Sequence, residues 1–447
     1  MFKVDIGGKQ STCCNGVSRR HALRLGASGL IGGLTLPRLL ELETKAAAAM
    51  PAKAKACIFI FLQGGPPHQD MWDPKPEAPE EVRGPFRTIQ TSVPGTFVTE
   101  HLPLCAKVAD KFSIVRSHSH NVNGHTTGYH YAMTGRRPNF ADGLNPIPNN
   151  TFYPSIGSVV SRELEAGGDI PKYINIPHMM GAGGPGFYGA EHAPFVIEAD
   201  PSQADFQVKD LQPSARLSAR RLSIRQKLLA AIDQRERERN QGPARVMSTY
   251  YEKAYSLMSS PEAKRAFDIN AESKAIRESY GYTQVGQCAL LARRMIEAGS
   301  RFIGIDSPGW DVHFNCFPSL STDLIPYADR AFSGLVNDLD QRGMLEETLV
   351  IMMGEMGRTP RVNAAAGRDH WSMAQSVVFA GGGTTPGSVI GATDEHATAP
   401  ATKPVTVNDI LRTITSLMGI NPDRKYYGPL GRPVPVVDGG RLIPGLV

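Results

Sequence analysis

Short apolar runs along the chain predict the strands of a buried sheet. Each run is rich in β-branched and aromatic side chains and stops abruptly at glycine, proline or polar residues. Strands that are covered on both faces, as in a parallel sheet, have this continuous apolar pattern. The runs occupy residues 57–62, 112–115, 173–176, 194–197, 302–305, 349–353 and 377–380.

Helix-periodic segments alternate with the last of these runs. Residues 284–298 are amphipathic at helical spacing and end at Gly299, and residues 324–342 end at Gly343. Glycine is favoured just past a helix C-terminus. Residues 407–418 predict a final helix. Because helices and strands alternate through short links, we expect right-handed parallel crossovers. The predicted fold class is α/β, with a mainly parallel central sheet sandwiched between helices.

The segments around this core are less regular. Residues 104–109 and 129–134 predict short helical turns, and 211–238 predict a charged, solvated helix. The Gly-rich stretch 181–189 lacks the lysine and hydroxyl residue of a phosphate-binding loop, which favours a flap. We interpret residues 50–447 as a single domain with loop and helical insertions at about 139–280.

The first 49 residues predict an export leader. Arg19 and Arg20 form the pair of a twin-arginine signal, a weakly apolar run follows, and Ala46 to Ala49 suit cleavage. An amphipathic N-terminal helix is the alternative. This pattern predicts export to the periplasm or the extracellular space. Because no run of 18 or more apolar residues follows, we expect no membrane span.

Composition adds little to this interpretation, but the charge distribution argues against a nucleic-acid-binding protein. The 447 residues are 41% hydrophobic and 20% charged, which is ordinary for a globular protein. Much of the net charge of +5 lies in the leader, so a basic domain face that would indicate nucleic acid is not expected. Of the six cysteines, the four beyond the leader (Cys57, Cys105, Cys288 and Cys316) suit buried small hydrophobes. Cys57–Cys105 or Cys288–Cys316 disulfides remain an alternative in an oxidising compartment.

Polar side chains cluster where the predicted strands end. They are Asp70 after the first strand, His118, His120, His125 and Thr126 after the second, Asp311 and His313 after residues 302–305, and Glu355, Arg358, Asp369 and His370 after residues 349–353. In open parallel sheets the ligand crevice lies at the carboxyl ends of the strands. We therefore expect these side chains to meet at one edge.

Mixed carboxylate and imidazole sets bind divalent ions such as Zn²⁺, Mn²⁺ or Ca²⁺. The predicted ligands are Asp311, His313, Glu355, His370 and Asp70, with His118, His120 and Asp369 as further candidates. Thr126, at a helix start, or its neighbour His125 is the candidate nucleophile. Arg358 is the candidate partner of a tetrahedral oxyanion. For each residue alone, a capped or salt-bridged polar group is the alternative.

Several segments also carry a resemblance to a known family. FIFLQGGPPHQDMWDPKP, HYAMTGRRP, GWDVH, GEMGRTP, GRDHW and VIGATD together resemble the domain-of-unknown-function family 1501 over residues 55–430. These are exported bacterial proteins of the alkaline phosphatase/sulfatase superfamily. The resemblance implies an alkaline-phosphatase-like fold with its site at the carboxyl ends of the strands.

The chain departs from the pattern that the superfamily implies. Gln63 stands where a metal-binding aspartate ends the first strand, and Met356 replaces a histidine. The aspartate–histidine ligand pair is shortened to Asp311-x-His313. His125 aligns with the modified cysteine of sulfatases, but their Cys/Ser-x-Pro-x-Arg signature is absent, which argues against a formylglycine sulfatase. The resemblance thus implies one ion as readily as a two-zinc site.

Two functions of different classes fit the sequence. The first is an exported metal-dependent hydrolase of a phosphate or sulfate ester, whose substrate is a small ester or a sulfated or phosphorylated glycan. The second is a non-catalytic relative that binds a glycan or an anionic cell-surface polymer, which the Gln63 and Met356 departures favour. The sequence predicts no organic cofactor and does not specify the oligomeric state.

Overall fold

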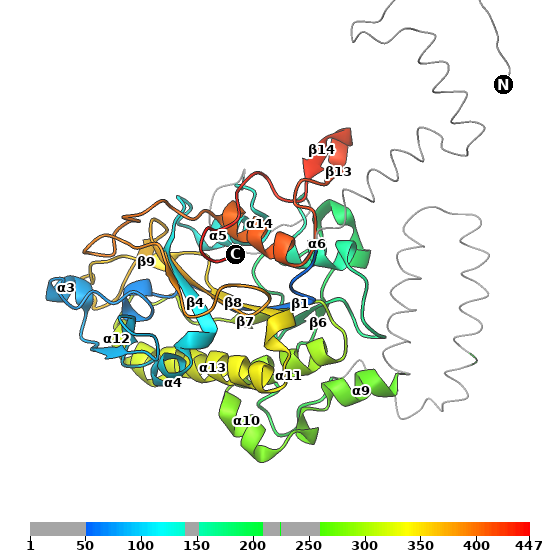
Figure 1. Cartoon of the computed structure of the whole chain (residues 1–447), viewed down its shortest axis with the longest axis horizontal. Helices are drawn as coiled ribbons and strands as arrows, with labels where there is room; N and C mark the ends of the chain where they lie inside the picture. Colours follow the sequence, from blue (N-terminus) through cyan, green and yellow to red (C-terminus); the bar gives the residue numbers. More distant parts are fainter. Residues whose placement is uncertain (1–50, 139–151, 209–223, 225–259) are drawn as a thin grey trace, which may run out of the picture. The chain divides into compact units, whose positions relative to one another are not determined.

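The computed structural model describes residues 51–138, 152–208, 224 and 260–447. The predicted leader and nearly all of the predicted helix 211–238 lie outside these residues, and residues Pro51–Val447 form one compact unit. Among the described residues, eight strands form a sheet in the order β12-β4-β11-β8-β1-β7-β5-β6 (Figure 1). The central strand β1 (Ala56–Leu62) pairs in parallel with β7 (Phe302–Ser307) and with β8 (Thr348–Met353).

One strand of this sheet runs against its neighbours. β11 (Gln375–Ala380) is antiparallel to β8 and to β4 (Phe112–His118), whereas β5 (Tyr173–Ile176) and β6 (Phe195–Val196) are parallel to the central strands. The predicted mainly parallel sheet is therefore confirmed, and β11 is the one antiparallel strand among these. The carboxyl ends of β1, β4, β7 and β8 share one edge, and β11 begins at that same edge.

Helices cover both faces of the sheet, as predicted. α11 (Gln284–Glu297) and α13 (Ile325–Gln341) lie on one face, and α5 (His125–Thr134), α6 (Ile156–Glu163) and α14 (Val407–Leu417) lie on the other (Figure 1). Every side chain of β1 is buried, with Ile58 and Ile60 in one core and Phe59 and Phe61 in the other. Burial on both faces explains why the run 57–62 is continuously apolar.

The remaining described elements are short. The helices are α3 (Glu80–Arg83), α4 (Pro103–Lys107), α9 (Pro261–Phe267), α10 (Lys274–Tyr280) and α12 (Cys316–Ser319), and a π-helical turn (Leu320–Leu324) precedes α13. The outer strands are β2 (Thr88–Gln90), β3 (Phe97–Thr99), β9 (Gly357–Arg358), β10 (His370–Trp371), β12 (Val389–Ile390), β13 (Lys425–Tyr427) and β14 (Pro433–Pro435).

Three predicted boundaries shift. β4 continues to His118, so part of the predicted loop is strand, and α5 begins at His125 instead of residue 129. The tail after Pro429, predicted to be irregular, contains β14, which pairs with β13. The polar end of β4 is ordered because it pairs with β11, where Gln375 lies opposite His118.

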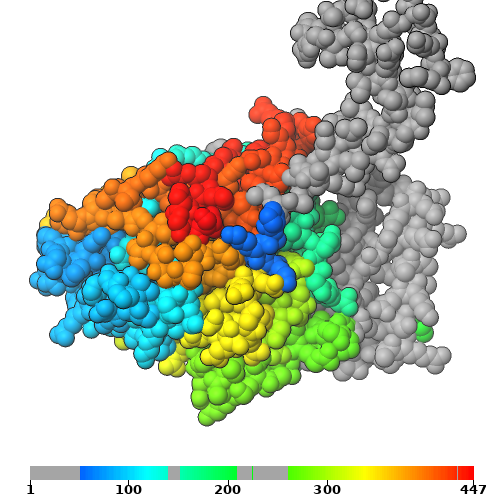
Figure 2. Space-filling model, viewed as in Figure 1, coloured from blue at the N-terminus to red at the C-terminus, as the bar shows by residue number. Residues whose placement is uncertain are grey.

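The start of the described unit is hydrogen-bonded to the end of α14. The amides of Lys53 and Ala54 donate to the carbonyl of Leu417 at 2.8 and 2.9 Å, which ties the entry to β1 to the end of α14. Figure 2 shows the corresponding blue and red surfaces next to each other. Cys57, Cys105, Cys288 and Cys316 are all free and buried, so within the described residues the interpretation as small hydrophobes holds.

Candidate metal centre

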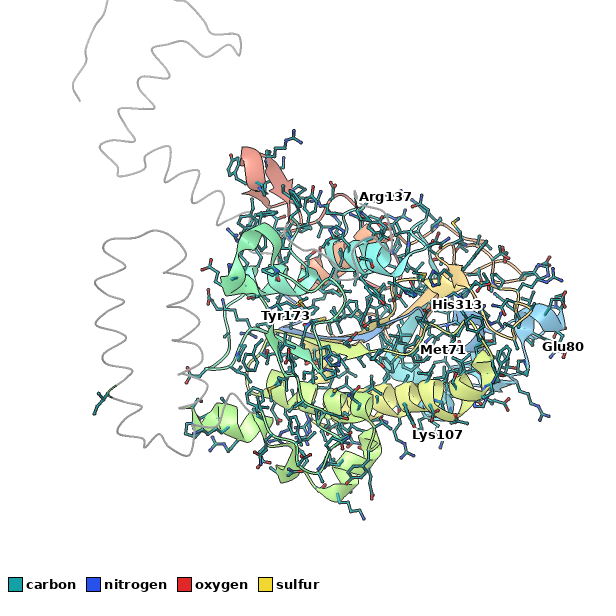
Figure 3. The ribbon with its side chains drawn as sticks, turned by 180° about the vertical axis from the view of Figure 1, so that it is seen from behind. Met71, Glu80, Lys107, Arg137, Tyr173 and His313 are labelled. Atoms are coloured by element: carbon teal, nitrogen blue, oxygen red, sulfur yellow. The ribbon has the colours of Figure 1, made fainter. Side chains whose placement is uncertain are left out.

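Four side chains from separate segments converge at the shared edge of the sheet. They are His125 at the start of α5, Asp311 and His313 in the loop after β7, and His370 at the start of β10. Their candidate ligand atoms all lie within 4.8 Å of one another. Figure 3 shows His313 and Tyr173, the first residue of β5, toward opposite ends of the sheet.

The Oδ1 atom of Asp311 is the common point of this cluster. It lies 3.1 Å from Nε2 of His125, 2.9 Å from Nε2 of His313 and 3.3 Å from Nε2 of His370. The two Nε2 atoms of His313 and His370 are 3.1 Å apart. Three imidazole nitrogens and one carboxylate oxygen therefore face one small volume.

The opposite nitrogen of each ring faces an acceptor. Nδ1 of His125 lies 2.7 Å from Oε1 of Glu355, and Nδ1 of His313 lies 2.8 Å from Oδ1 of Asp369. Nδ1 of His370 lies 2.7 Å from the carbonyl of Asn123. A carboxylate or carbonyl accepts only, so each neutral ring must carry its hydrogen on Nδ1. Each Nε2 lone pair is then directed at the other three groups.

Glu355 holds His125 in this orientation. Its carboxylate is fully buried and also accepts from the amide of Gly64 at 3.0 and 3.1 Å. The sequence predicted Glu355 to be a metal ligand, but in the structure it contacts Nδ1 of His125 and is not one of the four converging side chains. The close approach of the Gly64 backbone to Glu355 and to the Asp311 loop requires glycine at this position. Its φ is +118°, and an added Cβ would lie 2.4 Å from the amide nitrogen of Asp311.

Arg358 is buried, and its five N–H groups are all directed at protein acceptors. Nε donates to the carbonyl of Gly65 at 3.0 Å, Nη1 donates to the carbonyl of Arg368 at 3.1 Å, and Nη2 donates to the carbonyl of Gly64. The other two contacts are Nη2 to Oδ1 of Asp311 at 2.6 Å and Nη1 to Nε2 of His313 at 3.3 Å. Arg358 therefore positions the cluster, which differs from the predicted role as an oxyanion binder.

Burial and charge act in opposite directions on the protonation of this cluster. Burial alone would raise the pKa of Asp311, but Arg358 and His125 hold it well below its usual value. Burial disfavours a charged His125, yet Glu355 and Asp311 outweigh that effect and raise its pKa. Burial raises the pKa of Glu355, although its three N–H contacts favour the carboxylate. Burial, with the charges of His125 and Arg358, lowers the pKa of His370.

The arrangement fits a bound divalent cation. Lone pairs that converge on a carboxylate oxygen repel one another unless a proton or a metal ion lies among them. The buried Nε2 of His125 makes no well-aligned hydrogen bond among the described residues, although it lies 3.1 Å from Oδ1 of Asp311. Tetrahedral Zn²⁺ with bonds of about 2.0–2.2 Å holds its ligand atoms about 3.3–3.6 Å apart. The four contacts given above are 2.9–3.3 Å, and all the candidate ligand atoms lie within 4.8 Å of one another. Nη1 of Arg358 lies 3.3 Å from Nε2 of His313, so it faces the lone pair that a metal ion would use. A bound ion would take the place of this contact.

Other predicted residues lie near this centre or away from it. Asp369 supports His313, and Thr126 is buried in the first turn of α5. His120 lies behind the centre, with Nε2 at 2.8 Å from the carbonyl of Glu355, whereas His118 contacts the carbonyl of Val405 at 2.8 Å. Asp369, His120 and His118 do not belong to the converging set.

Asp70, predicted as a ligand, is used elsewhere. Its two carboxylate oxygens accept from Nε and Nη2 of Arg368 at 2.7 and 2.8 Å, and both side chains are fully buried. A buried carboxylate whose two oxygens are occupied by a guanidinium is not available to a metal ion. The sequence-based expectation for Asp70 is therefore corrected: it anchors the segment that carries Asp369 and His370.

One polar group at this edge was not predicted. Asp306, at the end of β7, is buried, and burial together with the charge of Glu355 raises its pKa to about 7. With its amide nitrogen toward Asp306, Gln63 donates to the two carboxylate oxygens at 2.8 and 3.0 Å and accepts from the Tyr129 hydroxyl at 3.0 Å. Gln63, directly after β1, therefore binds protein groups through both the nitrogen and the oxygen of its amide.

A cavity of about 390 Å³ lies close by but is separate from the cluster. Its lining includes Tyr282 and Thr283 directly before α11, Ser307 at the end of β7 and Tyr327 in the first turn of α13. None of the four converging side chains lines it.

Comparison with known proteins defines the family. Residues 54–447 match the family described as "Protein of unknown function (DUF1501)", so the chain belongs to the DUF1501 family. No curated protein sequence matches the chain. Within residues 51–138, 152–208 and 260–447, none of the helices combines the length and apolar character needed to cross a bilayer.

Similar solved structures include three ester hydrolases. The PsFucS1 sulfatase from Pseudoalteromonas sp. is 13% identical, with coverage of 86% of this chain and 70% of that chain and a TM-score of 0.37. The alkaline phosphatase of the Antarctic bacterium TAB5 is 12% identical, with coverage of 83% and 99% and a TM-score of 0.38. The phosphonate monoester hydrolase SpPMH from Silicibacter pomeroyi is 12% identical, with coverage of 88% and 76% and a TM-score of 0.35. Similarity at this level carries no argument about activity.

Proposed function

We propose that this protein is a metal-dependent hydrolase of phosphate or sulfate esters. The observation that carries the proposal is the orientation of three imidazoles. Acceptors on Nδ1 of His125, His313 and His370 direct all three Nε2 atoms at Oδ1 of Asp311. Histidine ligands of metal ions are usually held in this way by a second group.

The donor set favours a borderline ion over a hard one. Three imidazoles suit Zn²⁺ or another transition ion, whereas Ca²⁺ takes oxygen ligands. Of the ions that the sequence allows, Zn²⁺ fits best and Mn²⁺ is second. When bound, such an ion withdraws electron density from an ester oxygen and lowers the pKa of water.

The protein groups supply position and charge to this reaction. Glu355 and Asp369 fix the ligand rings, and Arg358 fixes Asp311. Because the donors of Arg358 are occupied by protein groups, a bound ion would itself supply the positive charge that an oxyanion needs. In the overall reaction, water adds to phosphorus or sulfur, the bond to the ester oxygen breaks, and the alcohol leaves with a proton.

Metal analysis and turnover test this function together. The full chain is purified without chelator, and its metal content and hydrolysis of phenyl phosphate and phenyl sulfate are measured for the wild type and for His313→Ala. We expect about one ion per chain, turnover that a chelator abolishes, and loss of both properties in the variant. Glu347→Gln, at the exposed amino end of β8, is the matched control. Turnover that survives both the chelator and His313→Ala would refute the proposal.

A non-catalytic binding protein is the second candidate. Two points favour it: the donors of Arg358 are occupied by protein groups, and Gln63 stands where the resemblance implies an aspartate. This candidate predicts metal-dependent binding of a sulfated or phosphorylated glycan with no release of product over a broad panel of esters. Product release at enzymatic rates would eliminate it.

We also propose export of the protein by the twin-arginine route. The pair Arg19–Arg20 and the run that follows support this proposal. In a bacterial host, replacing both arginines by lysine is expected to leave the precursor in the cytoplasm, as shown by cell fractionation. Unchanged export of the double variant would contradict it.

A further inference from the structure

An exposed aromatic ring lies next to the candidate metal centre. Phe314 directly follows His313, and its side chain is 77% exposed, the highest value for a phenylalanine among the described residues. The centroids of the two rings are 6.2 Å apart. The carboxylate of Asp311 is also about half exposed, so this side of the centre faces solvent.

The backbone on both sides of Phe314 is firmly held. Nδ2 of Asn363 donates to the carbonyl of His313 at 3.0 Å, and the amide of Asn315 donates to the carbonyl of Ala365 at 2.9 Å. Gly367 packs so closely that an added Cβ would lie 2.0 Å from the His313 carbonyl oxygen. Phe314 is therefore presented on an ordered segment.

Exposure alone would carry no argument, because single apolar side chains are common on protein surfaces. The distinguishing features here are position and order. The ring adjoins a candidate ligand, and its backbone is hydrogen-bonded to the segment that also carries Asp369 and His370. A group that is joined through an ester oxygen to the reacting atom would lie over this neighbourhood.

We infer that Phe314 binds the flat face of a ring in the alcohol portion of the substrate. The inference rests on the proposed function and names its substrate class as esters of ring-bearing alcohols. An aromatic side chain offers the same flat apolar contact to an aryl group and to the C–H face of a pyranose. Both sources share this chemistry, and the experiment separates them.

The experiment compares three alcohols, each as its phosphate ester and as its sulfate ester. The kcat/KM of the full-length, metal-loaded protein is measured for methyl, phenyl and galactose 6-esters of phosphate and sulfate. For Phe314→Ala we expect a loss of about tenfold on one or both ring esters, the size of a typical aromatic contact, and no change on the methyl ester. Phe314→Trp is expected to retain the wild-type preference. Tyr427→Ala, at an 80% exposed aromatic on β13, is the matched control.

If Phe314→Ala lowers kcat/KM only for the phenyl ester, the ring that Phe314 binds is an aryl group. If it lowers kcat/KM only for the galactose ester, the ring is a pyranose. A loss on both shows that Phe314 accepts either kind of flat ring. Equal effects on all three esters, or none, would overturn the inference. If the wild type turns over no ester, the proposed function fails separately. Binding of phenylphosphonate and methylphosphonate then decides: a wild-type preference for the phenyl ligand that Phe314→Ala abolishes supports the inference, and its absence refutes it.

Discussion

Replacing Glu355 by methionine tests whether the protein orients its candidate ligands from behind. Methionine keeps a similar unbranched volume but removes both acceptors. The buried amide of Gly64 and Nδ1–H of His125 would then lose partners at 3.0 and 2.7 Å. Leaving a buried donor without an acceptor costs about 1–3 kcal/mol. His125 can relieve that cost by moving its hydrogen to Nε2, and the lone pair that faces Asp311 is then lost.

The expected magnitude follows from this change of tautomer. Loss of the group that supports a ligand typically lowers metal affinity about 10–100-fold. The Kd for Zn²⁺, measured on the full chain by competition with a chromogenic chelator, is expected to rise by that factor in Glu355→Met. Glu355→Gln should retain most of the affinity, because the oxygen at the Oε1 position already accepts from both His125 and Gly64.

Two further variants make the comparison specific. In Asp369→Asn a single oxygen can still accept from His313 and Asn363, because both donors contact Oδ1, so the affinity should hold. Glu347→Met, directly before β8, controls for loss of a carboxylate next to the same strand. An unchanged Kd in Glu355→Met would refute the orientation argument. An equal loss in Glu355→Gln would show that the charge, and not the acceptor geometry, is responsible.

Three further predictions concern the scaffold. Arg368→Met strands the buried carboxylate of Asp70 and should lower the free energy of unfolding by about 3–5 kcal/mol in urea titrations; a loss below 1 kcal/mol would contradict the role of this ion pair. Burial lowers the pKa of His118 to about 4 in the folded chain. As the pH falls below 6.5, His118 is therefore protonated in the unfolded chain before it is protonated in the folded chain. Stability should therefore drop by about 2 kcal/mol for this residue between pH 7 and 5, and an equally steep drop in His118→Gln would rule out this cause. Gly64→Ala should weaken Zn²⁺ binding, because the added Cβ displaces the backbone of Asp311, and an unchanged Kd would show that the loop adapts.

The sequence by itself determined the core of the fold. The continuous apolar run of β1 and the alternation of β7, α13 and β8 require strands buried on both faces between helices. It also predicted that polar side chains at strand ends would meet, and the structure brings together Asp311, His313 and His370 from segments far apart in the chain.

Only the tertiary structure decided which polar side chains at this edge of the sheet contact one another. His370 reaches the shared edge because β11, which follows it, is antiparallel, and no local pattern encodes a strand's direction. Glu355 is a residue type that commonly binds metal ions, and Arg358 is one that commonly binds oxyanions. Their partners in the structure are instead backbone groups of Gly64 and Gly65 and side chains from other loops. The role of a polar side chain depends on which acceptors and donors surround it, and those neighbours are set by packing across the sheet edge.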